Sequence, residues 1–364
     1  MNVDSDKIDK LIIGQYVDLE KTSELHQLSK LFNPGFIKGM LKVIGSGLAN
    51  EQYYKQSLDI SLCWIDKRPL ADFSKQNIKD HNNNKITKKV EVADAAFYFF
   101  NENGYYQNGQ EKIAHESSLA LLFQAKRSVS VKEPIVPVGT SKAKNNSTAK
   151  ELALLSSWPK FDLYKTSGNK SPIYKDMEID CPTGEIPPFG WFGVCPPTKS
   201  EVWKSRWMCG PSKLGEKCQY TLGQLLEALL KRTTLGTDKV ESGKEFKFDP
   251  KWSSGQKLNG ESYWDVLNNE ILAQCKESNL PKSIFTTNKK RCVSAKEVIF
   301  LDEHMSLALL TSPDDSLCDC SSYSTKIAKH ITEIKTPDSF YEAALHDRAM
   351  PVVIFSIKSM EGQN

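Results

Sequence analysis

Two short stretches decide the fold: EVADAAFYFF at residues 91–100 and SLALLFQAKR at residues 118–127. Both are apolar and aromatic, which is typical of strands in a buried sheet. Side chains alternate across a strand, so Asp94 shares one face of the first stretch with apolar residues, whereas Gln124 and Lys126 share one face of the second. Each predicted strand therefore carries polar side chains among apolar neighbours.

The segment between the two stretches predicts how they pair. Residues 101–117 contain glycines and paired asparagines, which favour a loop or the tip of a long hairpin. In an antiparallel hairpin centred on Gly109, residues 94 and 124 are equidistant from the centre and lie opposite one another. Asp94 and Gln124 then meet on one face, with Lys126 one step further along it. The alternative is an ordinary buried hairpin whose polar residues lie at its solvated end.

These three residue types suit the hydrolysis of a phosphodiester. That reaction uses a divalent cation to polarise the phosphate, a positioned water, and a positive charge to stabilise the developing negative charge. Asp94 is a natural oxygen ligand for Mg²⁺, and the side-chain carbonyl of Gln124 is a neutral second ligand. Lys126 is placed to orient or deprotonate the water. The set lacks only a further carboxylate.

The same residues carry a resemblance to a known family. Asp94, followed about thirty residues later by LLFQAKR at 121–127, resembles the PD-(D/E)xK nuclease superfamily, in the subset in which Gln replaces the acidic residue of the (D/E)xK element. The flanking stretches CWIDKRP at 63–69 and WPKF at 158–161 are similar to the same subset. The resemblance covers roughly residues 50 to 165.

The resemblance implies a fold, a cofactor and partners. The implied fold is of the α/β (α+β) class, a restriction-endonuclease-like mixed sheet flanked by helices. Mg²⁺ or Mn²⁺ is held by Asp94 and Gln124, and an upstream helix often contributes a glutamate, for which Glu51 is the candidate. The implied activity is DNA cleavage in bacterial anti-phage defence or restriction, together with other proteins of such a system. Glu91, three residues before Asp94, is expected from alternation to face the opposite side.

Two other hypotheses stay open. One is a catalytically degenerate relative that binds nucleic acid or a partner protein without cutting, which Gln124 supports because a neutral ligand lowers the negative charge of the site. The other is a scaffold component of a multi-protein system, which the loop-rich C-terminal half favours.

The rest of the chain divides into three predicted regions. They are an N-terminal helical region at 1–48, the nuclease-like core at 49–165 and a C-terminal elaboration at 166–364. The elaboration contains helices near 221–232 and 262–274, and the first of them begins with a capping box. Apolar segments at 297–300, 305–310 and 352–357 predict further strands.

Composition limits the classes of function. The net charge of +3 arises from 48 basic and 45 acidic residues, so any contact with nucleic acid has to come from a local patch. Residues 85–150 carry ten Lys or Arg against six Asp or Glu, which is a mild enrichment. The first residues do not resemble a secretory signal, and no run of eighteen apolar residues occurs. We therefore expect a soluble cytoplasmic protein without membrane contact.

Two other groups of residues have both a functional and a structural interpretation. Nine cysteines make a complete disulfide framework improbable, and four of them are too irregularly spaced to favour zinc over reduced core thiols: Cys181, Cys195, Cys209 and Cys218. Cys318 and Cys320 favour a surface turn over a metal or redox site. An aromatic and basic group favours core packing over base stacking; its members are Trp191, Trp203, Lys204, Arg206 and Trp207.

Overall fold

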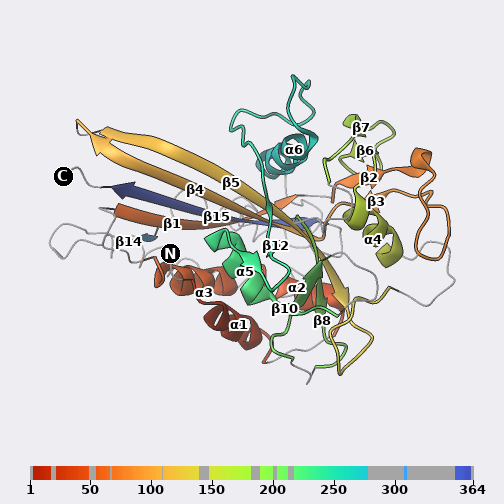
Figure 1. The fold of residues 1–364 in the computed structure, drawn as a ribbon, viewed down its shortest axis with the longest axis horizontal. Helices are drawn as coiled ribbons and strands as arrows, with labels where there is room; N and C mark the ends of the chain where they lie inside the picture. The colour runs from red at the N-terminus through yellow and green to blue at the C-terminus, as the bar shows by residue number, and fades with distance from the viewer. Residues whose placement is uncertain are drawn as a thin grey trace, which may run out of the picture.

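The computed structural model describes residues 3–17, 22–48, 55–65, 68–108, 110–138, 147–181, 189–199, 203–211, 217–277, 307–309 and 349–361. In these residues helices flank one long central sheet that contains both parallel and antiparallel strand pairs (Figure 1). The predicted fold class, a mixed sheet flanked by helices, is confirmed.

Nine of the described strands form the central sheet. They are β1 (Lys55–Ile65), β4 (Ala95–Gln107), β5 (Gln110–Arg127), β8 (Gly190–Cys195), β9 (Met208–Pro211), β10 (Tyr220–Thr221), β13 (Lys244–Glu245), β14 (Leu307–Leu309) and β15 (Met350–Glu361). Their order is β10-β9-β8-β5-β4-β15-β1-β14, and β13 pairs with β5. β15 is parallel to β4 and β8 is parallel to β5, whereas the other neighbours are antiparallel.

The central hairpin of β4 and β5 has the predicted register. From Ala95 opposite Phe123 to Asn103 opposite His115, every pair is spaced equally about residue 109. A bulge after Asn103 shifts the pairing by one residue towards the tip. Most of segment 101–117 is therefore paired strand rather than loop, because β4 and β5 continue almost to the turn. Of the two predictions for this segment, the long hairpin is confirmed.

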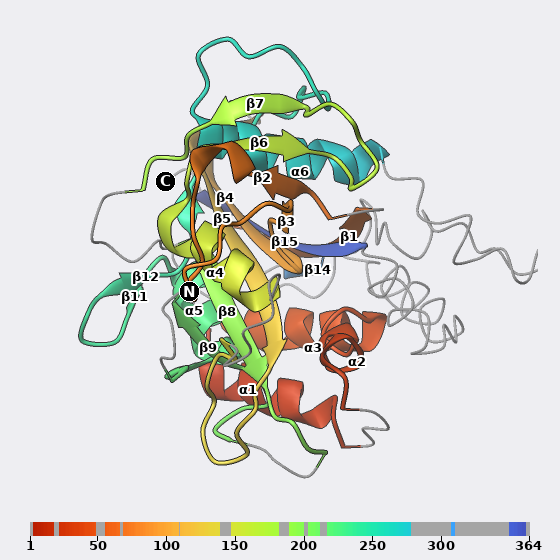
Figure 2. The same ribbon diagram turned by 90° about the vertical axis from the view of Figure 1, so that its right-hand side faces the viewer.

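One face of the central sheet is covered by helices from two distant parts of the sequence. These helices are α1 (Ser5–Gly14), α3 (Pro34–Gly45) and α5 (Leu222–Lys231), which lie below the sheet in Figures 1 and 2. Alternation on β4 and β5 turns Phe97, Leu121 and Phe123 towards this side, where they join one buried apolar core with the helices. A short helix, α2 (Glu24–Ser29), packs against β5.

The opposite face carries a second core. It is covered by α4 (Ser147–Ser157), α6 (Tyr263–Glu277) and a small sheet with the order β3-β2-β6-β7 (Figure 2). The small-sheet strands are β2 (Leu70–Asp72), β3 (Val90–Glu91), β6 (Phe161–Tyr164) and β7 (Tyr174–Met177). Ala96, Tyr98 and Leu122 face this side and join its core. Asp94, Gln124 and Lys126 have the same parity, so they belong to this face.

Several predicted elements of the C-terminal half are confirmed. Thr221 caps α5, and the capping box with Gln224 is present in both directions. α6 lies where a helix was predicted. The segment 352–357 lies within β15, and 305–310 contains β14. The segment 297–300 lies outside the described residues.

Candidate active site

Asp94 lies at the point where the chain leaves the small sheet and enters the central one. Its backbone N–H donates to the carbonyl of Phe123 at 2.9 Å, which extends the β4–β5 pairing by one residue. Asp94 therefore lies opposite Gln124 near the end of β5, with Lys126 two residues further on. The three side chains are buried, with exposed fractions of 1% for Asp94, 1% for Gln124 and 7% for Lys126.

The three predicted residues converge on one carboxylate oxygen. The Gln124 side-chain amide donates to Oδ2 of Asp94 through a short contact. The backbone N–H of Ala125 donates to the same oxygen at 2.9 Å. The ammonium of Lys126 lies 3.9 Å from it. The predicted juxtaposition of Asp94, Gln124 and Lys126 is therefore confirmed as geometry.

Two further carboxylates, which the sequence interpretation missed, surround Lys126. Oε2 of Glu151, on α4, lies 2.8 Å from Nζ of Lys126, and Oε1 of Glu24, on α2, lies 3.9 Å from it. Oε2 of Glu24 also accepts from the backbone N–H of Arg127 at 3.1 Å, so α2 is held against the end of β5. Ser23 caps α2 through the N–H of His26, which fixes Glu24 as the first helical residue.

The predicted helical glutamate, Glu51, lies outside the described residues. Among the described residues, the glutamate of an upstream helix that reaches the site is Glu24. Nothing in the sequence around Glu24 distinguishes it from an ordinary acidic residue in the first turn of a helix, where such residues are generally favourable. Its position at the site follows only from the packing of α2 on β5.

Arg68 contacts the other carboxylate oxygen of Asp94. Its Nη1 lies 2.7 Å from Oδ1 of Asp94 and 2.6 Å from Oε2 of Glu91. The expectation that Glu91 faces away from Asp94 is wrong. Alternation does not connect the two residues, because β3 ends at Glu91 and β4 begins only at Ala95, with a bend between them. Glu91 is held instead by the pairing of β3 with β2, next to Arg68.

These contacts define the Asp94 cluster, whose seven members are Glu24, Arg68, Glu91, Asp94, Gln124, Lys126 and Glu151. Four carboxyl groups face two cationic groups, so the fully ionised cluster has an excess of two negative charges. Burial raises the pKa of Glu24 to about 7, and the neighbouring carboxylates of Asp94 and Glu151 add to the shift, against the attraction of Lys126. Burial likewise raises the pKa of Glu151, which Lys126 partly offsets.

The surroundings of Lys126 favour its charged form, in contrast to those of Glu24 and Glu151. Burial alone would lower the pKa of Lys126, but the carboxylates of Glu151, Asp94 and Glu24 outweigh it and raise this pKa. Lys126 is therefore held as an ammonium ion. The uncompensated negative charge can be neutralised by protons on Glu24 or Glu151, or by a divalent cation.

The residues of the cluster fit a divalent cation that prefers oxygen ligands. Oε1 of Gln124 is buried and has no hydrogen-bond partner among the described residues, while Nε2 of the same amide donates to Asp94. An orphaned carbonyl oxygen next to carboxylates is a donor set for Mg²⁺ or Mn²⁺ rather than for zinc. Among the described residues, no three His, Cys, Asp or Glu side chains are arranged to hold a metal ion by themselves. A metal site at the Asp94 cluster would therefore depend on the neutral Gln124 as a ligand.

The charge excess predicts how stability changes with pH. The unfolded carboxyl of Glu24 titrates near 4.5, whereas the folded one titrates near 7. The folded state therefore binds more protons between these values, and the stability contributed by this proton is lost as the pH rises from about 4.5 through about 7. We expect Glu24→Gln to be more stable than the unmodified protein at about pH 8, by about 2 kcal/mol, and nearly equal to it at about pH 5.

Urea unfolding in EDTA at the two pH values measures this difference. Mg²⁺ or Mn²⁺ added at the higher pH should reduce the gap, because the cation neutralises the same charge. A variant that is equally destabilised at both pH values would show that Glu24 has an ordinary structural role.

The aromatic and basic group and the cysteines of the middle region are not members of the Asp94 cluster. Trp191 and Trp207 are fully buried, and Trp207 packs edge-on against Phe123. The buried guanidinium of Arg206 donates to Gln27 and to the carbonyls of Thr198 and Lys199. These three residues belong to the core, as predicted, whereas Trp203 is only partly buried and Lys204 is exposed. Four cysteines of the middle region are free thiols, namely Cys181, Cys195, Cys209 and Cys218. Cys318 and Cys320 lie outside the described residues.

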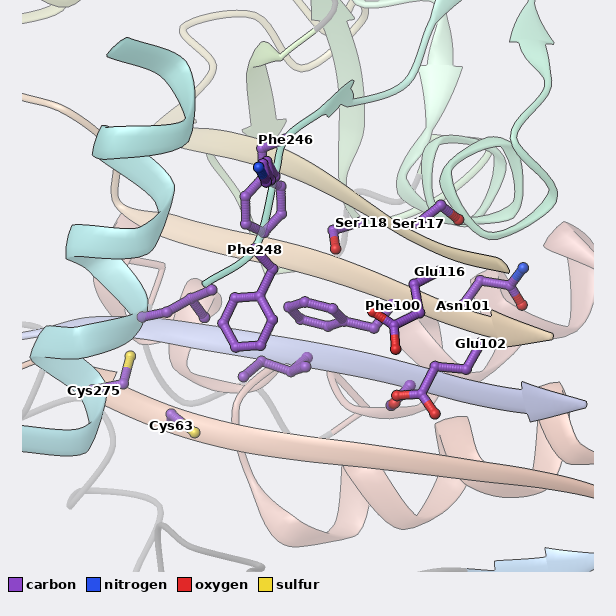
Figure 3. Close-up of a pocket in the computed structure, with 14 residues that line it drawn as sticks. Cys63, Phe100, Asn101, Glu102, Glu116, Ser117, Ser118, Phe246, Phe248 and Cys275 are labelled. Atoms are coloured by element: carbon purple, nitrogen blue, oxygen red, sulfur yellow. The ribbon is translucent and has the colours of Figure 1, made fainter. Parts of the chain in front are cut away.

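A cavity of about 520 Å³ lies elsewhere on the sheet, beside α6 (Figure 3). Phe100, Phe246 and Phe248 form its centre, the carboxylates of Glu102 and Glu116 lie towards one end, and Cys63 and Cys275 lie at the other. No member of the Asp94 cluster lines this cavity. The cluster and the cavity are therefore separate features of the same face of the sheet.

Comparisons with family models, curated proteins and solved structures found no match to this chain. In the described part of the chain, no helix combines the length and the apolar character that crossing a bilayer requires.

Proposed function

We propose that the chain is a metal-dependent nuclease whose active site is the Asp94 cluster. The observation that carries the proposal is the convergence of Asp94, Gln124, Lys126 and Glu151, to which the partly buried Glu24 and Glu91 add two negative charges beyond those that Arg68 and Lys126 balance. Structural ion pairs are normally balanced, because a buried unpaired charge is costly. An excess of two negative charges is therefore the signature expected of a site that takes up a divalent cation. The resemblance of residues 50 to 165 to PD-(D/E)xK nucleases supports the same assignment.

The residues of the cluster divide into ligands and proton-handling groups. Asp94, Gln124 through Oε1 and Glu151 would hold Mg²⁺ or Mn²⁺, which when bound supplies Lewis-acid activation of the phosphate and of water. Lys126 lies between Asp94 and Glu151, where its ammonium orients a water and stabilises negative charge on the phosphate. Glu24, with its pKa near 7, is suited to accept or return a proton at neutral pH. Its side chain is 27% exposed, so solvent reaches the cluster at this point.

The substrate that we propose is DNA. The proposed setting is bacterial anti-phage defence or restriction, and the proposed partners are other proteins of such a system. Both rest on the family resemblance. A basic substrate-binding patch near the cluster would draw on Lys88 and Lys150, which lie close enough to each other to interact electrostatically, and on Arg127 at the end of β5. Such a patch would make binding strongly dependent on salt.

The direct test is an assay for cleavage of supercoiled plasmid, single-stranded DNA and RNA by the purified full-length chain. We expect cleavage with Mg²⁺ or Mn²⁺ and none in EDTA, and the three substrates identify the strand type. Restoration of activity when metal is added back to the EDTA-treated protein would exclude a contaminating metal-independent nuclease.

A second candidate is a nucleic-acid-binding protein that has lost cleavage. The observation that favours it is the Arg68–Asp94 ion pair, because a guanidinium already neutralises the carboxylate that would bind metal. This candidate predicts binding of DNA that falls steeply with salt, together with no cleavage in either metal.

A further inference from the structure

Arg68 is held beside Asp94 by the small sheet. The chain passes from Arg68 through Pro69 into β2, which pairs with β3 through Leu70 opposite Glu91. The backbone N–H of Val92 donates to the carbonyl of Pro69 at 2.9 Å, so the segments before β2 and after β3 stay together. The Arg68 side chain is 7% exposed. The fold therefore places a buried guanidinium at Asp94 by backbone pairing.

The contacts of Arg68 differ from those of a structural arginine with one carboxylate partner. Such pairs favour the fork geometry, in which two N–H groups bind two oxygens of the same carboxylate. Here Nη1 contacts both Oδ1 of Asp94 and Oε2 of Glu91. One nitrogen of the guanidinium thus bridges two carboxylates, one of which is the proposed metal ligand.

Asp94 has one oxygen left for a cation, and Arg68 occupies it. Oδ2 of Asp94 already accepts from the Gln124 amide and from the N–H of Ala125. Oδ1 contacts only Arg68 among the interactions described. A divalent ion at Oδ1 would compete with the guanidinium for the same oxygen and would repel its charge.

We propose that Arg68 is an exchangeable internal cation that links metal binding to phosphate binding at the Asp94 cluster, an inference that rests on the proposed nuclease function. In the metal-free protein Arg68 neutralises Asp94. A divalent ion that takes Asp94 releases the guanidinium, which then binds a phosphate of the polynucleotide. Arginine suits this step because its planar N–H groups match phosphate oxygens.

This exchange makes the two ligands cooperative. A phosphate that draws Arg68 away from Asp94 leaves the carboxylate free and raises its affinity for metal. By linkage, bound metal raises the affinity for the polynucleotide by the same factor. The metal would therefore bind tightly only when the substrate is present, which would limit cleavage by a site whose third ligand is the neutral Gln124.

The test is a titration of the full-length protein with Mn²⁺, followed by electron paramagnetic resonance of the free ion. A short DNA duplex with phosphorothioate linkages serves as the phosphate ligand. We expect the duplex to tighten Mn²⁺ binding by the unmodified protein about tenfold. Arg68→Gln should bind Mn²⁺ about tenfold more tightly without the duplex, and the duplex should add little. Arg232→Gln is the matched control, because its Arg–Glu pair with Glu245 is distant and solvent-accessible. It should behave as the unmodified protein.

Arg68→Lys covers the case in which Arg68→Gln does not fold, which thermal melting reveals. A lysine keeps the charge but cannot offer the planar guanidinium, so the coupling between metal and duplex should shrink. If Arg68→Gln or Arg68→Lys binds Mn²⁺ no more tightly than the unmodified protein and retains the full coupling, the exchange is wrong although the metal site stands. If neither the unmodified protein nor any variant binds Mn²⁺, with or without the duplex, the proposed function fails as well.

Discussion

Lys126→Met is expected to slow DNA cleavage by about 10²- to 10⁴-fold, the usual effect of losing a group that acts on the attacking water. Methionine preserves the length and apolar stem of the side chain but removes the ammonium that lies between Asp94 and Glu151. The loss should appear in the rate at saturating metal and DNA, because the residue is proposed to act on the reaction rather than on binding alone. Single-turnover cleavage of a labelled duplex measures this rate.

Two further variants separate catalysis from folding. Lys126→Met leaves Glu151 buried without its partner, which on its own destabilises a protein by about 3–5 kcal/mol. Lys126→Arg keeps a positive charge for Glu151 and should retain more of the stability, but it should also be slow, since the larger planar guanidinium does not place its charge where the compact ammonium orients the water. Lys75→Met removes the ammonium that pairs with Asp162, and 71% of the Lys75 side chain is exposed. This control should cleave normally. Full activity in both Lys126 variants would remove Lys126 from the mechanism.

The sequence was sufficient to predict the centre of the site because the relevant information is local. Asp94 and Gln124 belong to two strands joined by one turn, and alternation with equal spacing about residue 109 determines both the face and the register. The bulge after Asn103 does not disturb this prediction, because it lies between the site and the tip. A resemblance in a few motif residues therefore agreed with a geometric argument that used no family.

The remaining members of the cluster could not be predicted in this way, since they arrive through tertiary packing. Glu151 lies on α4, but the direction in which α4 returns to β5 is not a property of the sequence of this helix. Glu24 reaches Lys126 from a region more than a hundred residues earlier. Glu91 was misjudged for a different reason: alternation was extended through residues 92–94, where the chain changes sheets.

The architecture shows the same limit on a larger scale. The apolar segment at 352–357 predicted a strand, and β15 is that strand. Its place between β4 and β1, parallel to β4, joins the end of the chain to the middle of the central sheet. Parallel pairing needs a long crossover connection, so no turn signal in the sequence identifies the partner. Hydrophobic pattern predicts that a strand exists, and only the assembled sheet determines its neighbours.

Two buried carboxylates on the same side of the central sheet show how a structural site differs from the proposed functional one. Glu270, on α6, is fully buried and accepts four hydrogen bonds, from the hydroxyls of Tyr174 and Ser254, the backbone N–H of Gly255 and the amide of Gln274. Its charge is dispersed over neutral donors. Asp94 lies instead among other charges that do not balance. Removing the carboxylate of Glu24 from this cluster should therefore have the opposite consequence for stability from removing that of Glu270.

Glu270→Ala is expected to destabilise the protein by about 4 kcal/mol, because it leaves several buried donors without an acceptor and each costs about 1–3 kcal/mol when water cannot replace it fully. Urea unfolding, followed by tryptophan fluorescence, measures the loss. Mn²⁺ affinity should stay unchanged as long as the variant is folded, since Glu270 is not a member of the Asp94 cluster.

Glu178→Ala is the matched control for this loss. Its carboxylate pairs with Lys160 at the surface, where the two side chains are 69% and 42% exposed, and such pairs contribute about 0–1 kcal/mol. Glu24→Gln provides the contrast within the cluster, because removing that charge should stabilise the protein above neutral pH. A loss of stability in Glu24→Gln as large as that in Glu270→Ala would mean that both carboxylates are structural. The excess of negative charge in the Asp94 cluster would then not indicate a metal site, and the nuclease proposal would lose its main physical support.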